Sequence, residues 1–123
     1  MFDWSDYLEL SRQLVGESGA TIQEARQRCA ISRAYYAAFC RTMDYLVNHG
    51  TTMTGTGDDH RFIQDRLRVH GRRGKYISSL LSSMRVDRNL ADYDNEFPGV
   101  AKAAMDTIRD AEFVIAEIAR LPR

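Results

Sequence analysis

Apolar residues recur every three or four positions along nearly the whole of this chain, and glycines separate one such run from the next. This spacing gathers the apolar side chains on one face of a helix. No stretch shows the sustained apolar and polar alternation of a strand, and prolines, which interrupt helices, occur at two positions. The sequence therefore predicts an all-α fold.

The apolar runs and their end signals divide the chain into five expected helices, over residues 4–15, 21–50, 59–69, 76–96 and 100–121. Asp3 is a candidate N-cap for the first helix, and Thr21 to Glu24 has the form of a capping box for the second. Asp58 or Asp59 is placed to cap the third, and a loop with two glycines, over residues 71–75, is expected before the fourth. These helices predict a single domain over residues 1–123, an up-and-down antiparallel bundle of four main helices plus a short extra helix.

The composition of the chain argues against several classes of protein. The hydrophobic share, 44 % of residues, is enough for a core, but no apolar run approaches the roughly 20 residues of a membrane span. The first residues lack the pattern of a signal peptide, so we expect a cytoplasmic protein with no membrane partner. Cys29 and Cys40 would lie about 16 Å apart on one helix, too far for a disulfide, and we expect both on its buried stripe. His49, His60 and His70 have no metal-ligand spacing, so neither a metal site nor a cofactor is expected.

Positive charge is concentrated in one part of a chain whose 17 basic and 17 acidic residues cancel. Within residues 61–75 a single aspartate, Asp65, accompanies the cations Arg61, Arg66, Arg68, Arg72, Arg73 and Lys75. Two interpretations stay open. The run is either a solvated helix face followed by a glycine loop, or a phosphate-binding strip in which Tyr76 stacks on a base.

The expected fourth helix becomes polar partway along its apolar stripe. At about 100° per residue, Arg88 projects within about 20° of that stripe, and Asp92 follows one turn later. The second helix carries Ser32 and Tyr36 on its own inward stripe, with Arg33 at the edge. Because a buried arginine needs a partner, these residues predict a polar cluster between the two helices, at a cleft or a subunit interface. The alternative is an ordinary ion pair four residues apart, whose arginine extends its guanidinium into water.

Three segments together resemble the HEPN family of small helical-bundle proteins: SRAYYAAF at residues 32–39, His60, and RVDRNLADYD at residues 85–94. They are most similar to the branch whose fourth helix has an arginine followed, after two or three residues, by Ala-Asp-Tyr. The resemblance implies a HEPN-like bundle that dimerises through its fourth helices. In active members an arginine, often followed by asparagine, precedes a histidine by four to six residues, and two such sets form a metal-independent RNA-cleaving cleft.

By this resemblance Arg88 and Asn89 match the first half of the catalytic motif, and Tyr93 stands where a histidine is expected, so these three are the candidate catalytic residues. The candidate binding residues belong to the polar cluster and the basic run: Asp92, Ser32, Arg33, Tyr36, Arg72 and Arg73. Tyrosine, with a reference pKa near 10, is a poor base. Cleavage that relied on Arg88 and Tyr93 should therefore be slow, unless the start of the third helix brings His60 against the cleft.

Two functions stand as alternatives. The first is a HEPN-type homodimer of the toxin–antitoxin or phage-defence kind that acts on RNA or nucleotide at Arg88, with a nucleotidyltransferase antitoxin as its partner. The second is a non-catalytic module that dimerises and docks such a nucleotidyltransferase, with Arg88 and Asp92 fixing the interface. The resemblance also makes Tyr93 a candidate for the addition of AMP by the partner enzyme.

Overall fold

A computed structural model describes residues 1–16, 21–52, 55 and 59–122 of the chain. Its α-helices are α1 (Ser5–Gly16), α2 (Gln23–Asn48), α3 (Asp59–Leu67), α4 (Gly71–Tyr93) and α5 (Val100–Arg120). A short 3-10 helix, η1 (Arg68–His70), joins α3 to α4. No strand occurs among the described residues, which confirms the prediction of an all-α fold.

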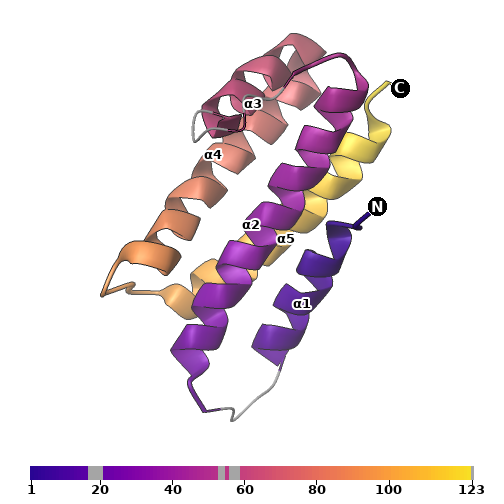
Figure 1. Cartoon of the computed structure of the whole chain (residues 1–123). Helices are drawn as coiled ribbons and strands as arrows, with labels where there is room; N and C mark the ends of the chain where they lie inside the picture. Colours follow the sequence, from indigo (N-terminus) through magenta and orange to yellow (C-terminus); the bar gives the residue numbers. More distant parts are fainter. Residues whose placement is uncertain (17–20, 53–54, 56–58, 123) are drawn as a thin grey trace.

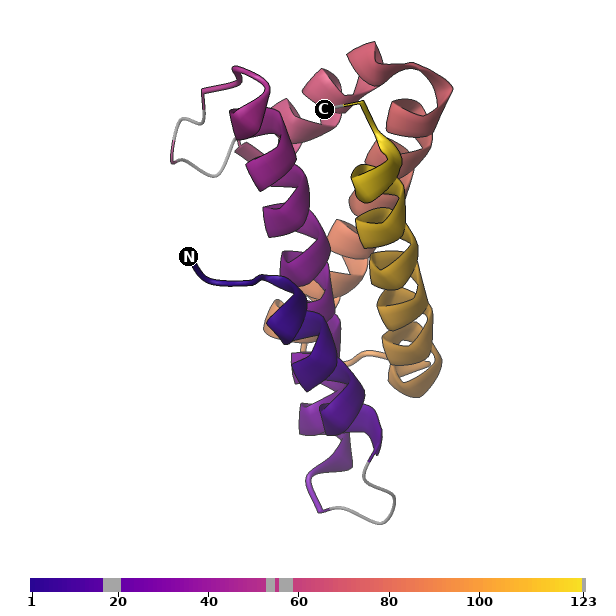
Figure 2. The same cartoon turned by 90° about the vertical axis from the view of Figure 1, so that its right-hand side faces the viewer.

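Four of the helices, α1, α2, α4 and α5, alternate in direction and form an antiparallel bundle (Figure 1). α2 is central and packs against the other three, whereas α3 lies beside the first turns of α4 at the end of the bundle near the C-terminus (Figure 2). Within the described ranges α1 and α4 do not contact each other. One face of α2 is therefore left between them.

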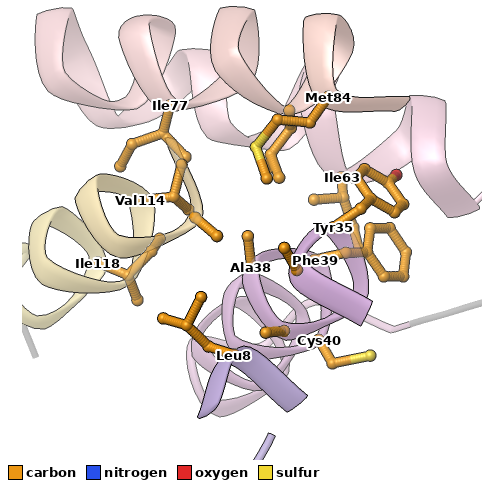
Figure 3. Close-up of a cluster of buried hydrophobic side chains, with 14 of the residues drawn as sticks. Leu8, Tyr35, Ala38, Phe39, Cys40, Ile63, Ile77, Met84, Val114 and Ile118 are labelled. Carbon is orange, nitrogen blue, oxygen red and sulfur yellow. The ribbon is translucent and has the colours of Figure 1, made fainter. Parts of the chain in front are cut away.

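The core forms where the apolar faces of the helices meet around α2 (Figure 3). Every α-helix contributes to it, through residues such as Leu8, Tyr35, Ala38, Ile63, Ile77, Met84, Val114 and Ile118. Fully burying one large apolar side chain stabilises the fold by about 1.5–3 kcal/mol. Ala34, Ala37 and Ala38 are also fully buried, and their small side chains let the neighbouring helices approach α2 closely.

α4 begins earlier than the sequence suggested, because one of its glycines has a packing role. The expected loop over residues 71–75 is instead the first turn of α4. A Cβ atom at Gly74 would lie 2.1 Å from the carbonyl oxygen of Leu67. Glycine at this position lets the end of α3 lie against α4 rather than interrupting the helix. At its other end α4 stops at Tyr93, before the expected Glu96.

The predicted helix starts are confirmed for α1 and wrong for α2. The backbone N–H of Ser5 donates to Oδ1 of Asp3 at 2.9 Å, as expected of a cap. At α2 the residue before the helix is Ile22, in a left-handed conformation and with no side-chain cap. The helix therefore starts one residue too late for the capping box, and Glu24 pairs with Arg28 instead, at 3.1 Å. Asp58 lies outside the described residues.

The two cysteines differ in burial, contrary to the expectation that both are buried. Cys40 is buried, whereas Cys29 is exposed. By helical phase both share the face of α2 between α1 and α4, and that face is uncovered where Cys29 lies, in the second turn. No helix in the described ranges combines the length and the apolar character needed to cross a bilayer.

Candidate functional site

Polar and aromatic side chains gather on the face of α2 that lies between α1 and α4. We call this group the Arg88 cluster, and it comprises Ser32, Arg33, Tyr35, Tyr36, His60, Arg88 and Asp92. Arg88 reaches the cluster from α4 and is 7 % exposed. A guanidinium is thus buried where the apolar stripe of α4 continues, and the alternative in which it extends into water is wrong.

Aromatic faces and one long ion pair hold Arg88 in place. Its guanidinium carbon lies 5.6 Å from the ring centre of Tyr35 and 5.4 Å from that of Tyr36, which is cation–π range. Its Nη1 lies 3.6 Å from Oδ2 of Asp92, beyond hydrogen-bond distance. Its Nε is buried and has no hydrogen-bond partner in the described part of the chain. Because a guanidinium has five N–H donors, Arg88 retains donors for a ligand.

A second guanidinium, that of Arg33, contacts the same tyrosine. Its carbon lies 5.4 Å from the ring centre of Tyr36 and 5.0 Å from that of Tyr7 in α1. Arg33 Nη2 donates to Oγ of Ser32 at 3.2 Å, and that hydroxyl donates to Oδ2 of Asp92 at 3.3 Å. Three helices therefore supply one connected network, and the polar cluster expected between the second and fourth helices is present.

His60, in the first turn of α3, is part of the same cluster. Its Nδ1 lies 2.5 Å from the hydroxyl oxygen of Tyr35, and its ring stacks on Phe39 with centroids 4.3 Å apart. The rings of Tyr35 and Phe39 lie at the edge of the core (Figure 3). An imidazole therefore stands close to Arg88 although the motif on α4 contains no histidine.

The surroundings set the protonation of both members of this pair. Burial, the largest cause, and the positive charges of Arg85 and Arg88 together lower the pKa of His60 to about 4. Burial raises the pKa of Tyr35 above its ordinary value. At neutral pH the imidazole is therefore uncharged and the phenol protonated, so the phenol is able to donate to Nδ1 and leave the ring proton on Nε2.

The other two candidate catalytic residues lie away from Arg88. Asn89 is exposed and lines a cavity between α3 and α4 together with Arg85. Tyr93 is the last residue of α4 and is 78 % exposed. The structure brings neither side chain into the Arg88 cluster.

Arg72 and Arg73, the two candidate binding residues of the basic run, also lie apart from the Arg88 cluster. Arg72 and Arg73 stand in the first turn of α4, about 22–24 Å along the helix from Arg88. Arg73 Nε pairs with Oε2 of Glu117 at 2.8 Å and so ties α4 to the end of α5. Arg72 is exposed. The strip expected over residues 61–75 is therefore divided between different faces of the molecule.

Sequence reasoning did not assign Tyr35 or Arg85 to the site and left the place of His60 open. Twenty-five positions separate Tyr35 from His60, so no single helical period connects them. Among the described residues no group of three or more His, Cys, Asp or Glu side chains could hold a metal ion. No protein-family model, curated protein or solved structure matches the chain.

Proposed function

We propose that this chain is a HEPN-type homodimer of the toxin–antitoxin or phage-defence kind, which acts on RNA or nucleotide at the Arg88 cluster. One observation carries the proposal: the buried guanidinium of Arg88 keeps free donors and stands beside the imidazole of His60. A guanidinium suits phosphate oxygens because its donors form a planar fork. An apolar stripe gains nothing from such a group unless the group serves an interface or a ligand.

The cluster offers two of the groups that metal-free RNA cleavage needs. Such cleavage requires a base for the 2′-hydroxyl, an acid for the leaving oxygen and a cation for the phosphorane. Arg88 supplies the cation. His60 supplies an imidazole from α3, which compensates for the absence of a histidine near Tyr93 on α4. General acid–base catalysis contributes about 10²–10⁴ in rate, so the imidazole is expected to decide whether cleavage is fast.

A bound phosphate would also adjust His60. With a pKa of about 4, the free imidazole is a weak base at neutral pH. Burial is the largest cause of that low value, and the charges of Arg85 and Arg88 add to it. The negative charge of a phosphate would offset these two charges, so the pKa of His60 should rise in the complex and make the imidazole a better base.

A second copy of the chain is proposed to complete the site. On the α2 face between α1 and α4, Tyr36 of the Arg88 cluster and the neighbouring Met43 have half-buried side chains. A two-fold axis across this face would place the same surface of both protomers in contact. The resulting cleft would hold one Arg88 from each protomer.

Arg88→Met tests the proposal, because methionine fills much of the buried volume while the charge is removed. We expect cleavage of single-stranded RNA or tRNA, or binding of nucleotides, to fall at least about 100-fold. Arg109→Met is the matched control, since it removes an exposed cation of α5 and should leave both activities unchanged. Equal behaviour of the two variants in gel-based cleavage and fluorescence binding assays would contradict the proposal.

Docking of a partner nucleotidyltransferase by a non-catalytic homodimer is the second candidate, and the exposure of Tyr93 favours it. A side chain 78 % exposed at a helix end is accessible to a partner enzyme that adds AMP to its hydroxyl. Under this alternative the wild-type protein neither cleaves RNA nor binds nucleotides. Arg88→Met then weakens the dimer, measured by analytical ultracentrifugation, and Tyr93 gains the mass of AMP on coexpression with the partner.

A further inference from the structure

Two adjoining cavities follow the junction between α3 and α4, which lie side by side (Figure 1). Their volumes are about 450 and 380 Å³, and Gln64 and Ser82 border both. We call the surface that they form the α3–α4 groove. Its charged lining residues are all cations: Arg61, Arg68, Lys75 and Arg85. No carboxylate lines either cavity in the described part of the chain.

The rest of the groove is lined by side chains that form hydrogen bonds. Four serines of α4 stand along it, with Gln64 and Asn89, and Val86 is the single apolar residue among the described lining residues. Ser78 Oγ donates to the backbone carbonyl of Gln64 at 3.0 Å and fixes the floor of the groove. Arginine, lysine, serine, asparagine and glutamine are the side chains that most often contact the phosphates of nucleic acids.

The cations of the groove lack the carboxylate partners that six cations elsewhere in the described chain have. Carboxylates lie within ion-pair distance of Arg12, Arg28, Arg73, Lys102, Arg109 and Arg120. Over the described ranges, no ion pair or hydrogen bond is formed by the side chains of Arg61, Arg68, Lys75 and Arg85. The Nε atom of Arg85 is buried and has no partner there. The groove therefore presents uncompensated positive charge in a chain with no net charge.

We infer that the α3–α4 groove binds the sugar–phosphate backbone of a single RNA strand several nucleotides long and leads it to Arg88. The inference rests on the proposed function and narrows its substrate from RNA or nucleotide to an oligonucleotide. From Lys75 to Asn89 the groove extends about 21 Å along α4. At one end the groove is lined by Arg61, which follows His60 in α3, and by Arg85, which lies one turn before Arg88 in α4, so the groove and the Arg88 cluster are adjacent along both helices.

The lining of the groove favours a single RNA strand over other polyanions. Arginine clusters also bind acidic peptide motifs, but serine, glutamine and asparagine side chains make up most of the described lining, and these contact phosphate and sugar oxygens in nucleic acids. The axes of two packed helices lie about 8–10 Å apart, so the crevice between them suits one strand rather than a duplex. No aromatic side chain lines the described groove, and binding should therefore depend on the backbone rather than on base sequence.

The test compares two double variants that each remove two cations. Arg68→Gln with Lys75→Gln alters exposed residues of the groove, and Lys102→Gln with Arg109→Gln, on the exposed face of α5, is the matched control. The probe is a fluorescein-labelled single-stranded RNA of 12 nucleotides, with anisotropy measured at several salt concentrations. We expect the groove variant to bind about tenfold more weakly and its logarithmic salt slope to fall by about 1.4, for two phosphate contacts. The control should stay within about twofold of the wild type.

Each other outcome overturns the inference in a recognisable way. Equal losses in both double variants would mean that total charge, not the groove, governs affinity. If a mononucleotide binds as tightly as the 12-nucleotide RNA, RNA binding in the groove is contradicted, whereas the proposal for Arg88 is unaffected. Tighter binding of an RNA hairpin, or equal competition by polyglutamate, would replace the single strand with a duplex or an acidic protein. Failure of the wild type to bind or cleave any RNA or nucleotide would remove both proposals together.

Discussion

The two flanks of α4 carry opposite charge. On the side of α3, the groove is lined by cations that include Arg68 and Lys75, without a carboxylate among its described residues. On the side of α5, Asp87 of α4 interacts with Asp106, and Asp106 with Asp110. A single helix thus separates a cationic groove from an acidic contact. The net charge of zero conceals this separation, because it averages over both flanks.

The two flanks also differ in how their charge is compensated. On the α5 side, Lys102 and Arg109 pair with Asp106 at 2.7 and 3.7 Å and lower its pKa. Burial and like charge raise the pKa values of Asp87 and Asp110, which makes that contact weakly unfavourable at neutral pH. The α3 side has no such compensation. The negative charge on the α5 side is therefore partly compensated by cations of the same helix, whereas the cationic flank stays available for a partner that supplies negative charge.

The largest expected effect comes from a substitution that disrupts the packing of α3 against α4. Gly74→Ala adds a Cβ atom 2.1 Å from the carbonyl oxygen of Leu67, and backbone has to move to relieve that contact. We expect a loss of about 3 kcal/mol in the free energy of unfolding, measured by urea denaturation. Ser79→Ala, at an exposed position of the same helix, should change it by less than about 0.5 kcal/mol. Equal urea midpoints for the two variants would show that α3 does not pack closely against α4 at Gly74.

A smaller effect on stability is expected when the pH is lowered, and it arises from His60 in α3. His60 has a pKa of about 4 in the folded protein, against an ordinary 6.5. Between these values the unfolded chain binds more protons, so stability present above pH 6.5 is lost as the pH falls toward 4. Since the ring is partly exposed, we discount the effect for solvent screening and expect a loss of about 1–2 kcal/mol. His60→Gln should flatten this part of the pH profile of urea unfolding, and parallel profiles would contradict the assignment.

The smallest effect is expected on the α5 flank, where a substitution should raise the stability of the protein rather than lower it. The raised pKa of Asp87 means that its charged form is disfavoured in the folded state, so Asp87→Asn should stabilise the protein at pH 7. For a largely solvated carboxylate we expect about 0.5 kcal/mol after screening, and the gain should disappear below about pH 4. Asp65→Asn, on the cationic α3 side, should not stabilise. Thermal unfolding at pH 7 and pH 3.5 distinguishes the two, and similar gains from both would remove the contrast between the flanks.

Helical phase predicted the inward-facing residues of single helices in part. Arg88 and Ser32 are buried as expected, whereas Asp92 and Cys29, which phase also placed toward the inside, are exposed. Capping was predicted less well, because Ile22 takes a left-handed conformation that no spacing rule anticipates. The glycine loop expected before α4 was wrong for a similar reason, since only the contact with Leu67 explains Gly74.

By itself the sequence determined the all-α fold, the helical segments and the guanidinium on the inward stripe of α4. These features follow from a 3.6-residue period, which is local and can be recognised in a linear chain. Tertiary structure alone decided that His60 joins Arg88, and that Arg68 and Lys75 line a groove that Arg73 does not. Such groupings depend on how helices distant in sequence pack against one another, and the phase of a single helix carries no information about its neighbours.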